Sequence, residues 1–135
     1  MKKLVFATIL FALVGIQLMA QIYVGHKKDE VVALIDKAMP DFSQAKVVNN
    51  TYNYLKYQDV SGEQTLLLFL DEKDVCTSIK FMSTYINLGD VIVDLNKKYQ
   101  KAGEDKWEFT EKGVAYIVEL QRGQWFFTVL TKKKI

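Results

Sequence analysis

Two segments of the chain carry apolar residues at helical spacing. The first follows Asp29 and stops before Pro40, and the second ends at Gly103. Apolar positions three and four residues apart form a stripe along one side of a helix. Both segments are therefore predicted to be amphipathic helices, the first capped by Asp29 and ended by Pro40, the second ended by Gly103. The two stripes are Val31, Leu34, Ile35 and Ala38, then Leu88, Val91, Ile92, Leu95, Tyr99 and Ala102.

The remaining apolar segments alternate with a period of two or run without interruption, which is typical of strands. Short clusters of Gly, Asp, Ser and Lys separate them and predict turns. Each predicted helix is followed by three such segments. This order predicts an α+β fold in which two α-β-β-β units form one mainly antiparallel sheet of about six strands, with both helices on one face. The predicted strands are 47–57, 65–70, 75–81, 106–110, 114–120 and 124–131.

The two halves also share some sequence. When Gly62 is aligned with Gly113, the halves match without gaps from there on, and Leu66 falls on Ile117 and Thr77 on Thr128. The matches fit an internal duplication, and they also fit chance agreement between apolar strands, so both explanations stay open.

The N-terminus has the three parts of a secretory signal peptide. Lys2 and Lys3 precede a charge-free stretch, residues 4–16, and Ala20 offers a small residue before Gln21. A transmembrane anchor is the alternative, but thirteen residues at ~1.5 Å each cover only ~20 Å of a ~30 Å hydrocarbon core. No cysteine lies near Ala20, so the lipid anchor of bacterial lipoproteins is not available. We predict that residues 1–20 are cleaved, that residues 21–135 form a single secreted or periplasmic domain, and that no stable membrane anchor remains.

Twofold α-β-β-β units behind such a leader resemble the small secreted domains grouped as β-lactamase-inhibitor-like or PepSY-like. The resemblance lies in the order of elements over most of residues 21–135. The Asp-x-x-Gly-x-Trp hairpins of PepSY-like repeats are absent, and residues 112–114 and 123–125 only partly match them. The resemblance implies protein inhibition or binding outside the cytoplasm, without catalysis, and it carries over no functional residue.

The composition of the chain excludes several kinds of functional site. The 135 residues include one His and one Cys, which excludes a His/Cys zinc site, a Cys-x-x-Cys pair and a disulfide within the chain. Lys plus Arg number 18 and Asp plus Glu number 16, and loss of Lys2 and Lys3 leaves 16 of each. A formally neutral domain lacks the positive charge that nucleic acid binding requires. We therefore predict no nucleic acid partner.

Candidate catalytic and metal-binding residues are few. His26 precedes the first helix and is expected to be an exposed, mobile side chain rather than a positioned general base. Asp71, Glu72 and Asp74 lie in a tight turn, and Lys73 and Val75 interrupt the alternate spacing of a calcium loop. No glycine-rich phosphate loop is present. The sequence predicts no enzyme, no cofactor and no metal.

Two of the predicted strands are apolar on both sides, so their second side is either covered by another segment or exposed as a binding patch. Strand alternation places Cys76 on this second face. There it is either an unreactive small apolar side chain or a free thiol able to form a disulfide between chains. The candidate binding surface is Tyr52, Tyr54, Leu67, Phe69 and Cys76.

These observations predict a secreted or periplasmic, non-enzymatic protein-interaction or inhibitor-like module that binds a protein partner or a second copy of itself. The alternatives are a small protein that encloses an apolar ligand and a minimal hydrolase built on carboxylates that meet in space.

Overall fold

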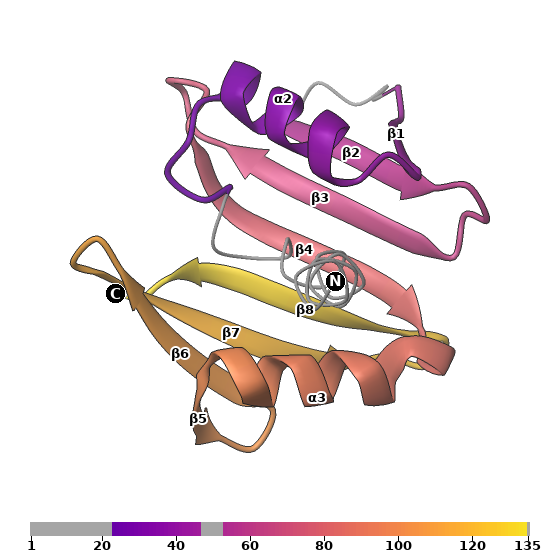
Figure 1. Ribbon diagram of the computed structural model, residues 1–135, viewed down its shortest axis with the longest axis vertical. Helices are drawn as coiled ribbons and strands as arrows, with labels where there is room; N and C mark the ends of the chain where they lie inside the picture. Colours follow the sequence, from indigo (N-terminus) through magenta and orange to yellow (C-terminus); the bar gives the residue numbers. More distant parts are fainter. Residues whose placement is uncertain (1–22, 47–52, 135) are drawn as a thin grey trace, which may run out of the picture.

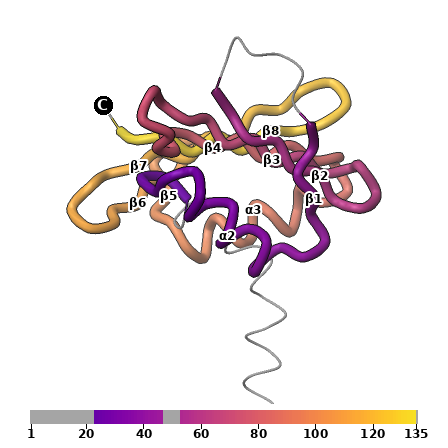
Figure 2. Tube along the Cα trace, turned by 90° about the horizontal axis from the view of Figure 1, so that it is seen from above, coloured from indigo at the N-terminus to yellow at the C-terminus, as the bar shows by residue number. Residues whose placement is uncertain are grey.

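The computed structural model describes residues 23–46 and 53–134, and it has one eight-stranded antiparallel sheet. Helices α2 (Lys28–Ala38) and α3 (Leu88–Lys98) lie on the same face of the sheet (Figures 1 and 2). The α+β class and the placement of both helices on one face agree with the sequence prediction. The strands are β1 (Phe42–Gln44), β2 (Tyr54–Asp59), β3 (Gln64–Leu70), β4 (Cys76–Thr84), β5 (Gln100–Gly103), β6 (Lys106–Glu111), β7 (Val114–Arg122) and β8 (Phe126–Lys133), and the short 3-10 helix η1 (Tyr85–Asn87) joins β4 to α3.

Each half of the chain contributes one side of the sheet. The strand order is β1-β2-β3-β4-β8-β7-β6-β5, so four consecutive strands of each half meet where β4 pairs with β8 (Figure 1). The first half carries α2 over its own strands, and the second half carries α3. The architecture is therefore two α-β-β-β-β units joined along one central strand pair.

The predicted count of about six strands was too low, because β1 and β5 were not recognised. Both are short edge strands, and β5 is exposed along its whole length. Without alternating burial they carry no period-two pattern. The segment of β5 was assigned to the second helix, which instead ends when the Tyr99 N–H bonds to the Leu95 carbonyl and Tyr99 turns extended.

The gapless alignment of the two halves is wrong by one residue. It pairs Leu66 with Ile117, yet Leu66 is buried under the helices and Ile117 lies on the opposite face. Four residues connect β2 to β3, whereas Lys112 and Gly113 alone connect β6 to β7. The gapless alignment shifts residue numbers by an odd amount from β3 to β7. Because side chains alternate between the two faces at every residue, only an even shift aligns the inward residues of β3 with those of β7.

The core lies between the sheet and the two helices. The helices contribute Val31 and Ile35 from α2, and Val91 and Leu95 from α3, as their apolar stripes predicted. The sheet contributes alternate residues from each long strand, and each fully buried aliphatic or aromatic side chain adds roughly 1.5–3 kcal/mol to the free energy of unfolding. The fully buried large side chains of the sheet include Tyr57, Leu66, Leu68, Ile79, Trp107, Val118 and Phe127.

The predicted signal peptide, residues 1–20, lies outside the described residues. Neither α2 nor α3, the helices of the described part, is long and apolar enough to cross a bilayer.

Candidate functional site

The side of the sheet that faces away from α2 and α3 is here called the open face. Among the described residues no helix covers it (Figure 2). Tyr54, Leu67 and Phe69 lie on this face and are half-buried, as strand alternation predicted. Tyr54 and Phe69 are direct cross-strand neighbours, with ring centroids 5.9 Å apart. Tyr52, the other tyrosine of the predicted patch, lies outside the described residues.

Cys76 does not belong to the open face, so this part of the predicted patch was wrong. Its side chain is 1% exposed and points into the core. The register shows the cause: Phe69 pairs with Ser78 while Leu70 pairs with Cys76, which leaves Thr77 as an extra residue in β4. Such a bulge reverses the facing of every residue before it. Simple alternation from Ile79 back to Cys76 could not anticipate that reversal.

We predict that the Cys76 thiol is unreactive in the folded protein. Burial raises the pKa of this thiol to about 12, and the thiolate is the reactive form. Iodoacetamide at mildly alkaline pH should leave the native protein unmodified by mass spectrometry and should alkylate it fully in concentrated guanidinium chloride. Rapid modification of the native protein would place the thiol at the surface.

Lysines alternate with apolar side chains across the open face. Lys56, Leu67, Lys80 and Leu130 are successive cross-strand neighbours on β2, β3, β4 and β8. The ammonium of Lys80 lies 5.7 Å from the ring centroid of Phe69, a cation–π contact that holds the lysine stem against the sheet. On β2, β3, β4 and β8 the open face is therefore both apolar and positively charged.

A groove of about 340 Å³ opens at one end of this face. It lies between the β2–β3 turn and the β7–β8 turn, and Thr65 and Met82 of the open face form part of its wall. Trp125 and Phe126 from the β7–β8 turn line it, and they are 77% and 46% exposed. The complete lining is residues 61–63, Thr65, residues 82–84, Trp125 and Phe126. We call it the end groove.

Sequence reasoning missed the end groove because Trp125 was placed inside a strand. The turn actually spans Gly123 to Phe126, and the Gly123 N–H bonds to the Phe126 carbonyl at 3.0 Å. A Trp-Phe pair two residues after Gly123 was the available signal. Its meaning depends on where the strand starts, which a run of apolar residues does not define.

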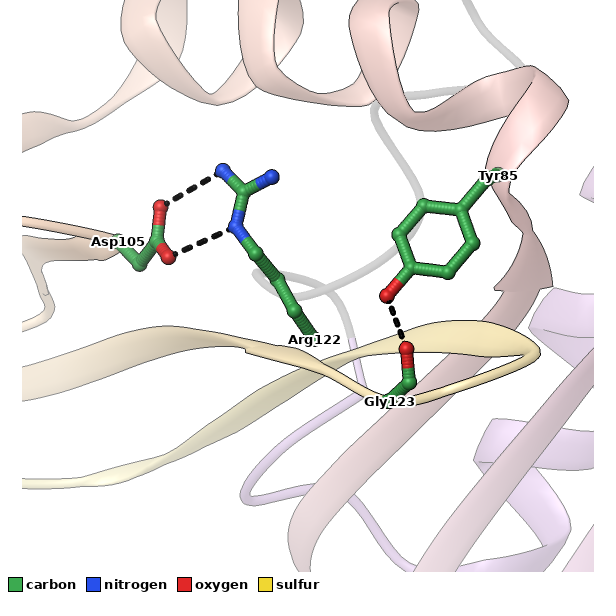
Figure 3. Close-up of polar contacts among 4 residues, drawn as sticks. All are labelled: Tyr85, Asp105, Arg122 and Gly123. Carbon is green, nitrogen blue, oxygen red and sulfur yellow. Dashed lines mark hydrogen bonds and ion pairs between the residues drawn. The ribbon is translucent and has the colours of Figure 1, made fainter.

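The turn that carries Trp125 is anchored from two sides, as Figure 3 shows. The Arg122 guanidinium donates two hydrogen bonds to the Asp105 carboxylate, at 3.0 and 3.1 Å. The Tyr85 hydroxyl, from η1, donates to the Gly123 carbonyl. The guanidinium also lowers the pKa of the Asp105 carboxyl, which keeps the pair charged. The anchored turn presents its exposed aromatics in a defined position, so less freedom is lost on binding.

Gly123 is needed for this turn. A Cβ at position 123 would lie 2.8 Å from the Phe126 carbonyl oxygen, inside van der Waals contact. We expect Gly123→Ala to lower the free energy of unfolding by about 1–3 kcal/mol, as measured by urea denaturation. Gly89→Ala is the matched control: its Cβ would meet nothing within 4 Å in helix α3, and alanine should stabilise by about 0.5 kcal/mol. Equal effects of the two substitutions would contradict the turn geometry.

The remaining polar candidates serve the scaffold. His26 lies at the surface: its Nδ1 is 3.0 Å from Glu30 Oε2 in an exposed contact, and its backbone carbonyl accepts the Cys76 N–H at 2.8 Å. The Asp71 carboxylate accepts the backbone N–H groups of Lys73 and Val75, which makes the acidic cluster a hairpin turn. Within the described residues, no group of three or more His, Cys, Asp or Glu side chains is arranged to hold a metal ion.

A buried ion pair is the other notable polar feature. Asp94 and Lys98 lie one turn apart on α3, and their charged atoms are 2.9 Å apart. Burial lowers the pKa of Lys98, and the Asp94 carboxylate opposes that shift. The Asp94 carboxylate is therefore matched with a lysine rather than with a second carboxylate.

No known family model, curated protein or solved structure matches this chain. The resemblance to β-lactamase-inhibitor-like and PepSY-like domains stays a prediction.

Proposed function

We propose that this protein is an exported, non-enzymatic binding module that captures a protein partner on its open face and in its end groove. One observation carries the proposal. An anchored turn holds Trp125 and Phe126 in water beside a groove large enough for a side chain. Tryptophan and other aromatic residues are enriched among the residues that dominate protein interfaces.

The surroundings of the groove support the same function. Three segments at this end of the sheet (Figure 1) each carry an exposed apolar residue: Val60 in the β2–β3 turn, Ile86 in η1, and Trp125 in the β7–β8 turn. Isolated surface hydrophobes are common, but exposed aromatic residues that line a groove, as Trp125 and Phe126 do, are typical of a docking site. The half-buried Leu67 and Phe69 extend this surface along the sheet.

Export is part of the proposal and depends on residues 1–20. Their basic start, apolar stretch and small residue at the exit favour secretion or a periplasmic location. An inhibitor-like role outside the cytoplasm is what the predicted resemblance to the small secreted domains named above implies.

Peptide selection tests the proposal and does not require an identified partner. Random peptides of about 12 residues, which span roughly 40 Å when extended, are displayed on phage and selected on the immobilised protein. Enriched peptides are then synthesised with a fluorescent label, and their affinities are measured by anisotropy. We expect Trp125→Ala to weaken binding by about tenfold or more, because truncation of a central interface tryptophan typically costs at least ~2 kcal/mol.

Val93→Ala provides the matched control. Val93 is also an exposed apolar residue, but it lies on α3, on the other side of the sheet. This variant should bind the selected peptides as the unmodified protein does. Peptides that bind the Trp125→Ala variant with unchanged affinity would contradict the proposal, as would a selection that enriches nothing over the bare support.

A further inference from the structure

We propose that the partner segment is acidic as well as apolar, with an apolar side chain in the end groove and a carboxylate above Lys80. This inference rests on the proposed function and adds the chemistry of the occupant. It follows from the distribution of charge on the open face.

Net positive charge on the open face is concentrated on strands β2, β4 and β8. Lys56, Lys80 and Lys132 lie on the open side of β2, β4 and β8. No Asp or Glu faces outward from β2, β3, β4 or β8 in the described part of the chain. Within the same described residues, none of these three lysines forms an ion pair.

The carboxylates of the open face lie on β6 and β7 and have lysines beside them. Glu108 on β6 pairs with Lys134 at 2.7 Å. Glu119 on β7 stands directly opposite Lys106 in the β6–β7 register. The lysines of β2, β4 and β8 are therefore available to pair with a partner. Specific interfaces place opposite charges against each other, so the partner is expected to supply carboxylates.

The spacing along β4 relates the charge to the end groove. Met82 lines the groove and Lys80 lies two residues before it on the same face, a separation of about 6.6 Å along a strand. An extended partner segment has the same rise per residue. An apolar anchor held against Met82 and Phe126 therefore places the side chain two positions along the segment above Lys80.

An acidic protein segment fits this surface better than a nucleic acid or an anionic membrane does. Leu67 and Leu130 flank Lys80 on the neighbouring strands. Apolar side chains of a protein partner can pack on these leucines. The phosphate groups of a nucleic acid backbone would instead place charged atoms next to them. Three lysines are also few for a membrane surface, where recognition of anionic lipids uses clusters of about four to eight Lys or Arg residues.

The peptides selected above provide the test. We expect the enriched sequences to carry net negative charge, with Asp or Glu about two positions from a large apolar residue. Lys56→Glu/Lys80→Glu should weaken these peptides by about tenfold or more, and Lys80→Gln by less. Added salt should weaken binding to the unmodified protein more than to the double variant. Lys97→Glu, an exposed charge reversal on α3, should leave the affinity unchanged. Circular dichroism melts establish that each variant is folded.

The outcomes separate this inference from the proposed function. Neutral or basic peptides that lose affinity with Trp125→Ala but not with Lys56→Glu/Lys80→Glu would overturn the acidic partner and leave the binding module intact. Peptides insensitive to Trp125→Ala would overturn both. Phosphatidylglycerol-containing vesicles or oligothymidylate that bind more tightly than the peptides, and lose affinity with the same lysine variants, would replace the protein partner with a lipid or nucleic acid one. A concentration-dependent dimer abolished by those variants would replace it with a second copy of this chain.

Discussion

Replacing Leu95 with aspartate should abolish the cooperative unfolding transition of this protein. Leu95 is 2% exposed and lies at the centre of the α3 stripe, against the strands of the second half. An ionised carboxylate at this position would be buried without a partner, because Lys98 is already paired with Asp94. Burial of an unpaired charge costs several kcal/mol, on top of the lost leucine packing, and domains of this size have only about 5–15 kcal/mol to lose.

Val93→Asp is the control for this prediction. Val93 lies two residues away on the same helix and is 53% exposed, so the same substitution there keeps the carboxylate in water. We expect its free energy of unfolding to remain within about 1 kcal/mol of the unmodified protein. Thermal melts followed by circular dichroism distinguish the two. A Leu95→Asp protein that melts cooperatively near the original temperature would show that this side of α3 does not face the core.

The two tryptophans should respond oppositely to truncation. Trp107 is fully buried in β6, opposite Val118 of β7, and its indole N–H donates to Asn96 Oδ1 at 2.8 Å. Trp107→Ala removes this packing and leaves a cavity, which should lower the free energy of unfolding by about 3–5 kcal/mol. Trp125→Ala alters an exposed turn and should change it by no more than about 0.5 kcal/mol.

Urea denaturation followed by circular dichroism measures both variants on one scale, without relying on tryptophan emission. Trp107→Phe keeps most of the buried volume and loses the bond to Asn96, so it should fall between the two, near 1 kcal/mol. A large loss of stability in Trp125→Ala would mean that this side chain supports the fold, and it would remove the observation on which the proposed function rests.

The open face differs from the usual solvent-facing side of an antiparallel sheet. Polar and apolar residues normally alternate along each strand of such a sheet, so that one side is polar and the other is apolar. Here Leu67, Phe69 and Leu130 occupy outward positions, and lysines stand between them rather than replacing them. The aliphatic stems of the lysines cover part of the apolar surface, while their ammonium groups stay in contact with water.

Local sequence was sufficient wherever one pattern decided the structure. The α2 and α3 stripes predicted the helices and their buried residues, because a helix returns to the same side every three to four residues. Strand alternation placed Tyr54, Leu67 and Phe69 on the outward side for the same kind of reason. The end of α3 was different: Tyr99 continues the helical stripe, yet it turns extended and stacks its ring on Phe109 with centroids 4.6 Å apart. Tertiary packing overrode the helical pattern there.

The composition and the periodicity of the chain determined the α+β class, the two helices and the side of the sheet on which most residues lie. Tertiary structure alone decided the facing of Cys76, because a bulge in β4 depends on how β3 pairs with it. It also decided the end groove, whose residues from the β2–β3 turn, β4 and the β7–β8 turn meet only when β4 pairs with both β3 and β8. Periodicity is a property of neighbours along the chain, whereas a binding surface is made by residues that only strand pairing brings together.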